Sequence, residues 1–200
     1  MKGLLIYDSI SARRNEWFIE NLIFNFNKKN IELKLAIVEY DEIKSNEKID
    51  FAIVRTISPN INKLLENIGV RVFNNYKTSF IANNKWNTYL MCKKLKIPTM
   101  NTLHCFDNID LQNFPCVIKS CSGHGGTEVF WVDSLEQFMQ IKTYFQSLNK
   151  DYIIQKPCSV LGKDMRIYVL GNNIVASILR YNEKDFKSNY SLGGKVKNVN

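Results

Sequence analysis

Cysteine is sparse in this sequence, and its spacing matches neither a disulfide framework nor a zinc site. The five cysteines are odd in number and include no C-x-x-C pair: Cys92, Cys105, Cys116, Cys121 and Cys158. A chain without a disulfide pattern fits a reducing compartment, where disulfides are rare. We therefore expect a reduced, cytoplasmic protein.

Long apolar runs are also missing. The apolar stretch near the N-terminus, residues 4–7, ends at Asp8 and is shorter than the apolar core of a signal peptide. A membrane-spanning helix needs about 20 consecutive apolar residues, and no segment approaches that length. The sequence predicts no membrane partner.

Several familiar catalytic and nucleotide-binding motifs are absent. His104 and His124 are the only histidines, and neither forms a Ser/His/Asp or Cys/His arrangement that sequence order can define. The first predicted strand is followed by Asp8-Ser-Ile-Ser rather than G-x-G-x-x-G, and no helix opens with G-K-[ST]. These absences argue against a dinucleotide-binding site and against a P-loop.

Positive charge is the clearest feature of the composition. Lys and Arg total 27 against 19 Asp and Glu, giving a net charge of +8 and a pI near 9.2. Such a balance favours anionic partners: nucleotides, carboxylates, nucleic acid or an acidic peptide. The basic residues are dispersed and no nucleic-acid-binding motif is present, which disfavours nucleic acid.

Alternating strand and helix patterns in residues 1–80 predict a small α/β domain with a parallel sheet. The expected strands are 3–7, 33–38, 51–55 and 70–73, and the expected helices are 15–29 and 61–68. Apolar residues recur at helical spacing in the first of these helices, which predicts core packing. They are Trp17, Phe18, Leu22, Ile23 and Phe26. Arg13 and Arg14 are expected in a solvated turn.

The second half has a different pattern. A helix over 84–95 precedes Pro98, and a second helix over 134–148 is capped by Ser134. Short strands are expected at 116–119, 128–132, 152–155, 164–170 and 174–179. This half is predicted to be α+β and largely antiparallel.

The segment Ser120-Cys-Ser-Gly-His-Gly-Gly-Thr127 carries three glycines and several hydroxyl groups. Glycines allow the backbone to approach an oligophosphate closely and to offer N–H donors. Lys119, at the end of the preceding strand, would add a cation for phosphate oxygens. Read alone, the loop is equally well explained as a flexible hairpin connection.

Charged residues gather in the last two predicted strands. Asp164 and Arg166 share one face because side chains repeat every two residues, and Arg180 ends the neighbouring strand. This arrangement predicts a cationic wall, with surface ion pairing as the alternative interpretation. Asp185-Phe-Lys-Ser-Asn189 and Gly193-Gly194 follow.

In order and spacing, five segments resemble the RimK-type ATP-grasp ligases over about residues 80–200. They are Asn84-Lys85-Trp86, Pro115-Cys-Val-Ile-Lys119 with its glycine loop, Ile153-Ile-Gln-Lys-Pro157, Gly162-Lys-Asp-Met-Arg166, and Asp185-Phe-Lys-Ser-Asn189 with Gly193-Gly194. The resemblance implies an α/β fold: a Rossmann-like pre-ATP-grasp domain over 1–80, then an α+β ATP-grasp domain truncated at its C-terminal end. Within that domain it implies a central lid subdomain over 81–156 and the start of a C-terminal subdomain over 157–200.

The resemblance also implies roles for individual residues. Lys85 and Lys119 would bind the phosphates of ATP, and the glycine loop with Gly123, Gly125 and Gly126 would close over them. Gln155, Lys156 and Pro157 would hold the adenine, mainly through backbone groups, and Asp164 would lie near the ribose or the substrate edge. Arg166, Arg180 and Asn189 would be catalytic, facing the transferring phosphate and the substrate carboxylate.

The implied reaction is ATP-dependent joining of a carboxylate to an amine through an acyl phosphate. Positioning and charge stabilisation would supply most of the catalysis. The expected partners are ATP and small carboxylate and amine substrates or an acidic peptide. Because related ligases are commonly oligomers, a homo-oligomer is also expected.

The sequence departs from the family pattern at three places. Gln155-Lys156 stands where an acidic residue is frequent, and Lys187 stands where Arg is common. The acidic-x-Asn motif for Mg²⁺ would lie beyond residue 200, so this chain has no predicted metal site. The last predicted strand pair has no partner, which favours a fragment that is inactive alone. The alternative is a nucleotide-binding module without catalysis.

Overall fold

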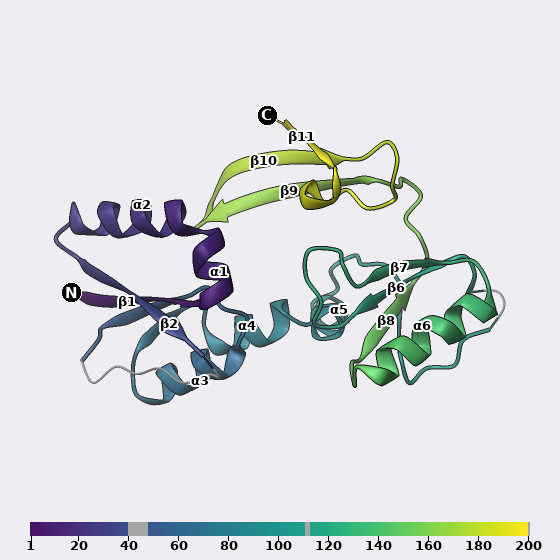
Figure 1. The fold of residues 1–200 in the computed structure, drawn as a ribbon, viewed down its shortest axis with the longest axis horizontal. Coiled ribbons are helices and arrows are strands. Elements are labelled where there is room, and N and C mark those ends of the chain that lie inside the picture. Colours follow the sequence, from purple (N-terminus) through teal and green to yellow (C-terminus); the bar gives the residue numbers. More distant parts are fainter. Residues whose placement is uncertain (40–47, 111–112, 200) are drawn as a thin grey trace. The chain divides into compact units, whose positions relative to one another are not determined.

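A computed structural model describes residues 1–39, 48–110 and 113–199 (Figure 1). The chain divides into two compact units, Met1–Thr88 and Tyr89–Asn200. Helix α5 (Lys85–Lys94) begins in the first unit and ends in the second.

The first unit has the parallel sheet that the sequence predicts. Its strands lie in the order β2-β1-β3-β4 and all pair in parallel. They are β1 (Lys2–Asp8), β2 (Glu32–Val38), β3 (Phe51–Val54) and β4 (Arg71–Phe73). The helices are α1 (Ser9–Arg14), α2 (Glu16–Asn27), α3 (Pro59–Asn67) and α4 (Tyr76–Ala82).

Alternation along β1 gives this sheet a core on each face. Leu4 and Ile6 join one buried cluster that includes Ile61 of α3. Leu5 and Tyr7 join another that includes Ile19 of α2. Burial of apolar side chains on both faces is the usual condition of a parallel sheet covered by helices.

Two predictions for the first unit are wrong. Arg13 and Arg14 lie in helix α1 rather than in a turn, because the Asp8 side chain accepts a hydrogen bond from the Ser11 N–H and caps that helix. Trp17 and Phe18 are 75% and 40% exposed, so neither belongs to the buried core. The buried residue on this part of α2 is Ile19, outside the predicted set.

The second unit contains two antiparallel sheets. The first has the order β5-β8-β6-β7, and helix α6 (Leu135–Ser147) packs on one of its faces (Figure 1). Its strands are β5 (Thr102–His104), β6 (Cys116–Ser120), β7 (Val129–Val132) and β8 (Tyr152–Gln155). Ile118, Ile154 and Phe145 are among the buried residues between this sheet and α6.

The second sheet has the order β11-β10-β9. Its strands are β9 (Lys163–Leu170), β10 (Asn173–Tyr181) and β11 (Lys195–Asn198), and a 3-10 turn, η2 (Tyr190–Leu192), precedes β11. The expectation that β9 and β10 lack a further partner is wrong, since Arg180 of β10 pairs with Val196 of β11. Strand β11 was missed because Lys195-Val-Lys-Asn has a single apolar residue and no alternating pattern.

No helix in the described part of the chain combines the length and apolarity required to cross a membrane.

Candidate nucleotide-binding site

In the sheet β5-β8-β6-β7, the face opposite α6 carries Lys119, the cation predicted to bind phosphate. Cys116 and Ile118 of β6 pack toward α6, so Val117 and Lys119 project from the other face. In the strand register Lys119 lies opposite Ile153 of β8. Lys119 is half-buried, and this burial lowers the pKa of its ammonium group.

On this face the Lys119 side chain forms a hydrogen bond with Gln155. The Lys119 Nζ donates a hydrogen bond to Gln155 Oε1 at 2.8 Å, and Gln155 Nε2 donates to Thr102 Oγ1 at 2.8 Å. Lys119, Gln155 and Thr102 belong to β6, β8 and β5, three neighbouring strands. The structure thus joins a predicted phosphate ligand to a predicted hinge residue.

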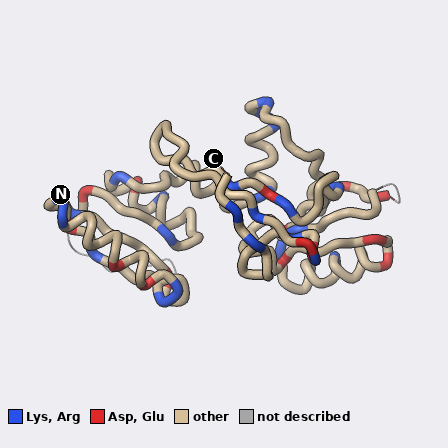
Figure 2. The backbone as a smooth tube through the Cα atoms, turned by 90° about the horizontal axis from the view of Figure 1, so that it is seen from above, with Lys and Arg blue, Asp and Glu red and all other residues tan. Residues whose placement is uncertain are grey.

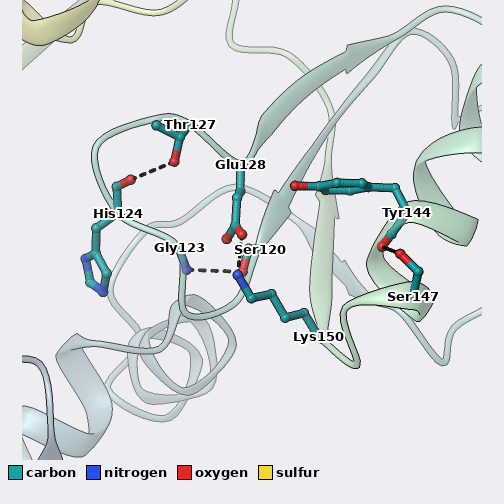
Figure 3. A network of polar contacts seen from close by, with 8 residues as sticks. All are labelled: Ser120, Gly123, His124, Thr127, Glu128, Tyr144, Ser147 and Lys150. Atoms are coloured by element: carbon teal, nitrogen blue, oxygen red, sulfur yellow. Dashed lines mark hydrogen bonds and ion pairs between the residues drawn. The ribbon is translucent and has the colours of Figure 1, made fainter.

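The glycine loop has an ordered base (Figure 3). Ser120 is fully buried, and its Oγ accepts a hydrogen bond from the Gly123 N–H at 3.1 Å. At the other end of the loop, Glu128 forms an ion pair with Lys150. These contacts fix both ends of the segment at the sheet.

The far part of the loop depends on glycine geometry. Gly125 and Gly126 have φ values of +73° and +86°, a region that other residues rarely adopt. The residues on either side of these two glycines are joined by a hydrogen bond: Thr127 Oγ1 donates to the His124 carbonyl at 3.4 Å (Figure 3). The loop therefore has a defined turn at the position where the resemblance expects a lid.

This turn lies against Asn189, one of the predicted catalytic residues. A Cβ atom on Gly126 would be 2.9 Å from Asn189 Oδ1 and 3.1 Å from Leu192 Cδ1. Trp131, in the strand β7 that follows the loop, also lies close to this segment: the centroids of the Trp131 and Phe186 rings are 5.5 Å apart. The structure brings the glycine loop and the Asp185-Phe-Lys-Ser-Asn189 segment together.

Asp164 and Arg180 form an ion pair across β9 and β10. Arg180 Nε donates to Asp164 Oδ1 at 2.7 Å, and the guanidinium also contacts Oδ2. Ser188 Oγ donates to the same Oδ2 at 2.6 Å. These hydrogen bonds, above all that from Arg180, hold the pKa of the Asp164 carboxyl below its usual range.

The ion pair reduces the positive charge that the predicted cationic wall would offer. The Asp164 carboxylate likewise raises the pKa of Arg180, whose charge it balances. Arg166 is exposed and lies opposite Ile178, two register positions from this pair. Of the two predicted catalytic arginines, Arg166 has no carboxylate within ion-pair distance among the described residues.

The other predicted residues lie at the edges of this arrangement. Lys85 begins α5 within the first unit, so the site described above consists of second-unit residues. Gln155 and Lys156 line a hollow of about 320 Å³ that also includes Met100, Asn101 and Asn113. Pro157 follows β8 and is half-buried.

Two residues of this arrangement were not singled out from the sequence. Ser188 lies inside the recognised Asp185–Asn189 motif, so the motif itself was the available signal. Thr102 had no such signal, because β5 has only three residues and was not predicted.

Cysteine, histidine and aspartate side chains lie together at one place where the sequence predicts no Cys/His arrangement. Cys105 Sγ lies 3.4 Å from His104 Nδ1 and 3.7 Å from Asp151 Oδ1. Burial, together with the Asp151 charge, raises the pKa of the Cys105 thiol. A nucleophilic cysteine needs a lowered pKa, so this cluster does not have the electrostatics of a catalytic thiol.

The described residues do not supply the magnesium site that the resemblance implies. Among residues 1–39, 48–110 and 113–199, no three His, Cys, Asp or Glu side chains are grouped so that they could hold a metal ion. Lys and Arg are spread over both units rather than gathered in one block (Figure 2). The polar groups described in the candidate site are Lys119, Arg166, the glycine loop and the Asp164–Arg180 ion pair.

Several known proteins are similar to this chain in sequence or in fold. Residues 82–200 match the family model of the RimK-like ATP-grasp domain. The chain is 27% identical over 200 residues to the alpha-aminoadipate–LysW ligase LysX of Saccharolobus solfataricus, covering 90% of this chain and 72% of that protein. It is 27% identical over 200 residues to the uncharacterized protein MG011 of Mycoplasma genitalium, covering 98% and 68%.

A solved structure gives the same fold. The D-alanine–D-alanine ligase from Bacillus anthracis superposes with a TM-score of 0.75 over 100% of this chain and 72% of that chain, at 16% sequence identity. At that identity the likeness concerns the fold. It agrees with the α/β architecture of both units as each is described above.

Proposed function

Since the chain belongs to the RimK-like ATP-grasp family, as its motifs predicted, we propose that it carries the nucleotide-binding part of a carboxylate–amine ligase. The family relation supports ATP binding and ATP-dependent amide-bond formation in general. The residue roles and the substrate class are part of this proposal.

In the proposed reaction a substrate carboxylate oxygen attacks the γ-phosphorus of ATP, and ADP leaves. The resulting acyl phosphate is attacked at its carbonyl carbon by an amine, which forms the amide and releases inorganic phosphate after the amine loses a proton. Lys119 would neutralise phosphate charge, and the glycine loop would offer backbone N–H donors. Arg166 and Asn189 would contact the transferring phosphate or the substrate carboxylate.

One observation carries this proposal: the contact between Gly126 and Asn189. A loop suited to binding phosphate lies against a side chain suited to contacting a reacting carboxylate. A Cβ atom placed on Gly126 would be 2.9 Å from Asn189 Oδ1. Lys119 lies on the strand that leads into the same loop. A hairpin loop of purely structural role would not require this approach to the Asp185–Asn189 segment.

The proposed acceptor is an acidic substrate, either an amino acid or the acidic end of a peptide. The net charge of +8 favours such partners. The name of the relative LysX describes the joining of alpha-aminoadipate, a carboxylate-bearing amino acid, to LysW. Arg180 is already paired with Asp164, so Arg166 would be the main cation for the substrate.

Calorimetric titration of ATP with magnesium into the protein tests nucleotide binding. Lys119→Ala is expected to lose most of the affinity, because a charge-assisted hydrogen bond to phosphate contributes about 1.5–3 kcal/mol. Lys142→Ala is the matched control. The substitution removes the same charge, and Lys142 lies on α6, at the opposite face of the sheet. Absence of ATP binding by the folded wild-type protein would overturn the proposal.

Phosphate release separates the ligase from the alternative, a nucleotide-binding module without catalysis. A ligase releases phosphate only when ATP, an acidic carboxylate and an amine are all present. ATP binding without any such release would favour the non-catalytic module. Salt-sensitive binding of DNA or RNA that survives Lys119→Ala would instead favour the nucleic-acid interpretation.

A further inference from the structure

A chain of three hydrogen bonds crosses the sheet from β6 to β5. Lys119 Nζ donates to Gln155 Oε1 at 2.8 Å, and Gln155 Nε2 donates to Thr102 Oγ1 at 2.8 Å. Thr102 Oγ1 in turn donates to the backbone carbonyl of Met100 at 3.0 Å. The chain therefore ends on a fixed backbone acceptor.

This fixed end determines the orientation of the Gln155 amide. The single hydroxyl hydrogen of Thr102 is used by the Met100 carbonyl, so the Thr102 oxygen can only accept from Gln155. The Gln155 NH₂ group must then point to Thr102, and its carbonyl oxygen must point to Lys119. The opposite orientation would set an NH₂ group against the ammonium group, donor against donor.

The orientation matters for the charge on Lys119. A carbonyl oxygen accepts one of the three N–H donors of an ammonium group and leaves its net charge in place. Among the described residues no carboxylate lies within ion-pair distance of Lys119. Thr102 is buried and Gln155 half-buried, so both side chains are held in their positions.

We propose that Gln155, held by Thr102, is a positioning residue that aims Lys119 at an anionic phosphate group and leaves its charge uncompensated. This inference rests on the proposed nucleotide-binding function. It assigns the Gln155 side chain to Lys119 rather than to the nucleobase, which leaves the base to backbone groups of the hinge. A carboxylate in place of the Gln155 amide would instead pair with Lys119.

The decisive variant is Gln155→Glu, which keeps the size and the acceptor atom but adds a negative charge beside Lys119. Affinity for ATP is expected to fall about tenfold or more, because the new ion pair competes with phosphate. Affinity for adenosine, which has no phosphate, is expected to stay within about twofold. Gln140→Glu on α6 introduces the same charge at the opposite face and should leave both affinities unchanged.

Thr102→Val tests the other end of the chain without changing any charge. It removes the hydroxyl that orients Gln155, and a loss of about two- to fivefold in ATP affinity is expected, again without loss of adenosine. Thermal melting establishes that each variant is folded. If Gln155→Glu does not fold, Gln155→Met and Thr102→Val together still test the positioning of Lys119.

The outcomes distinguish this inference from the proposed function. No ATP binding by the wild-type protein overturns both. ATP binding by the wild type and equally tight binding by Gln155→Glu overturns the positioning role alone. Loss of adenosine together with ATP in folded Gln155→Glu and Gln155→Met also overturns it, because the side chain would then be a contact of the base.

Discussion

In the sheet β5-β8-β6-β7, most side chains of the two central strands are buried, and one face packs on α6. In the sheet β11-β10-β9 of the same unit, no strand residue is buried. Apolar side chains such as Leu170 and Ile174 are 73% and 66% exposed there. The first sheet thus has a hydrophobic core of its own, and the second does not.

The sheet β11-β10-β9 is held mainly by hydrogen bonds, an ion pair and a ring contact. Arg180 and Ser188 both bond to Asp164, and the ring of Phe186 lies against Trp131 of the first sheet. Gly162 allows the start of β9 to lie against the backbone of residues 182–185. The two sheets therefore differ in what supports the candidate residues: a sheet with a buried core carries Lys119, and a sheet held by polar contacts carries Asp164, Arg166 and Arg180.

The largest expected effect is the loss of a core side chain from the first sheet. Phe145 is fully buried between α6 and the sheet and contacts the rings of Phe130, Tyr144 and Tyr152. Phe145→Ala should lower the free energy of unfolding by about 3–5 kcal/mol through lost burial and the cavity left behind. Urea unfolding followed by circular dichroism measures it.

Leu170→Ala is the matched truncation in the second sheet. Leu170 is 73% exposed, so its loss should change the free energy of unfolding by less than about 0.5 kcal/mol. A cost comparable to that of Phe145→Ala would contradict the comparison, since it would mean that the second sheet also has a hydrophobic core in solution.

A smaller effect is expected from Gly162→Ala, at the start of β9. Gly162 has a φ of +65°, and a Cβ there would lie 2.3 Å from the Asn182 carbonyl oxygen and 2.7 Å from that of Asp185. Both atoms belong to the backbone, so the segment must shift, at a cost of about 1–3 kcal/mol. Hydrogen exchange should increase in β9 and β10 while β6 and β8 keep their protection.

Gly171→Ala separates crowding from backbone conformation. Gly171 has a similar φ of +60°, but nothing lies within 4 Å of a Cβ placed there. It should cost only the conformational part, about 1 kcal/mol. Equal effects of the two substitutions would mean that the close approach at Gly162 contributes nothing.

The same contrast explains which parts of the fold the sequence predicted. β6, β7, β8 and α6 lie within one or two residues of their expected bounds, because burial gives their sequences a clear periodicity. β5 and β11 were missed, since they have three and four residues and their edge positions impose little pattern. Helix α1 is not predicted because it has only six residues and directly follows β1.

The sequence names candidate residues for the site but does not predict which of them contact one another. Lys119, Gly126 and Asn189 were named from the order of motifs, and the structure brings Gly126 and Asn189 together. The contact from Gln155 to Thr102 joins residues 53 positions apart. It depends on the register between β5 and β8, and local sequence patterns do not specify that register.

The smallest expected effect concerns the polar contacts of the second sheet. The hydrogen bond from Arg180 lowers the pKa of Asp164, so the carboxylate contributes stability above its unfolded pKa of about 3.9 and loses it as the pH falls through the lower folded value. Asp164→Asn should cost less than about 1 kcal/mol at pH 7, because the Asp164 side chain is 39% exposed and solvent screens the pair.

Unfolding measured between pH 7 and pH 2 checks the sign of this effect. The difference in stability between the wild type and Asp164→Asn should shrink as the pH falls below about 4, since the protonated wild-type carboxyl then resembles the amide. Glu183→Gln is the control, because Glu183 and Lys195 are 75% and 66% exposed and 3.8 Å apart. A difference that is constant over this range would assign the role of Asp164 to its hydrogen bonds alone, and the second sheet would then be held without a contribution from charge.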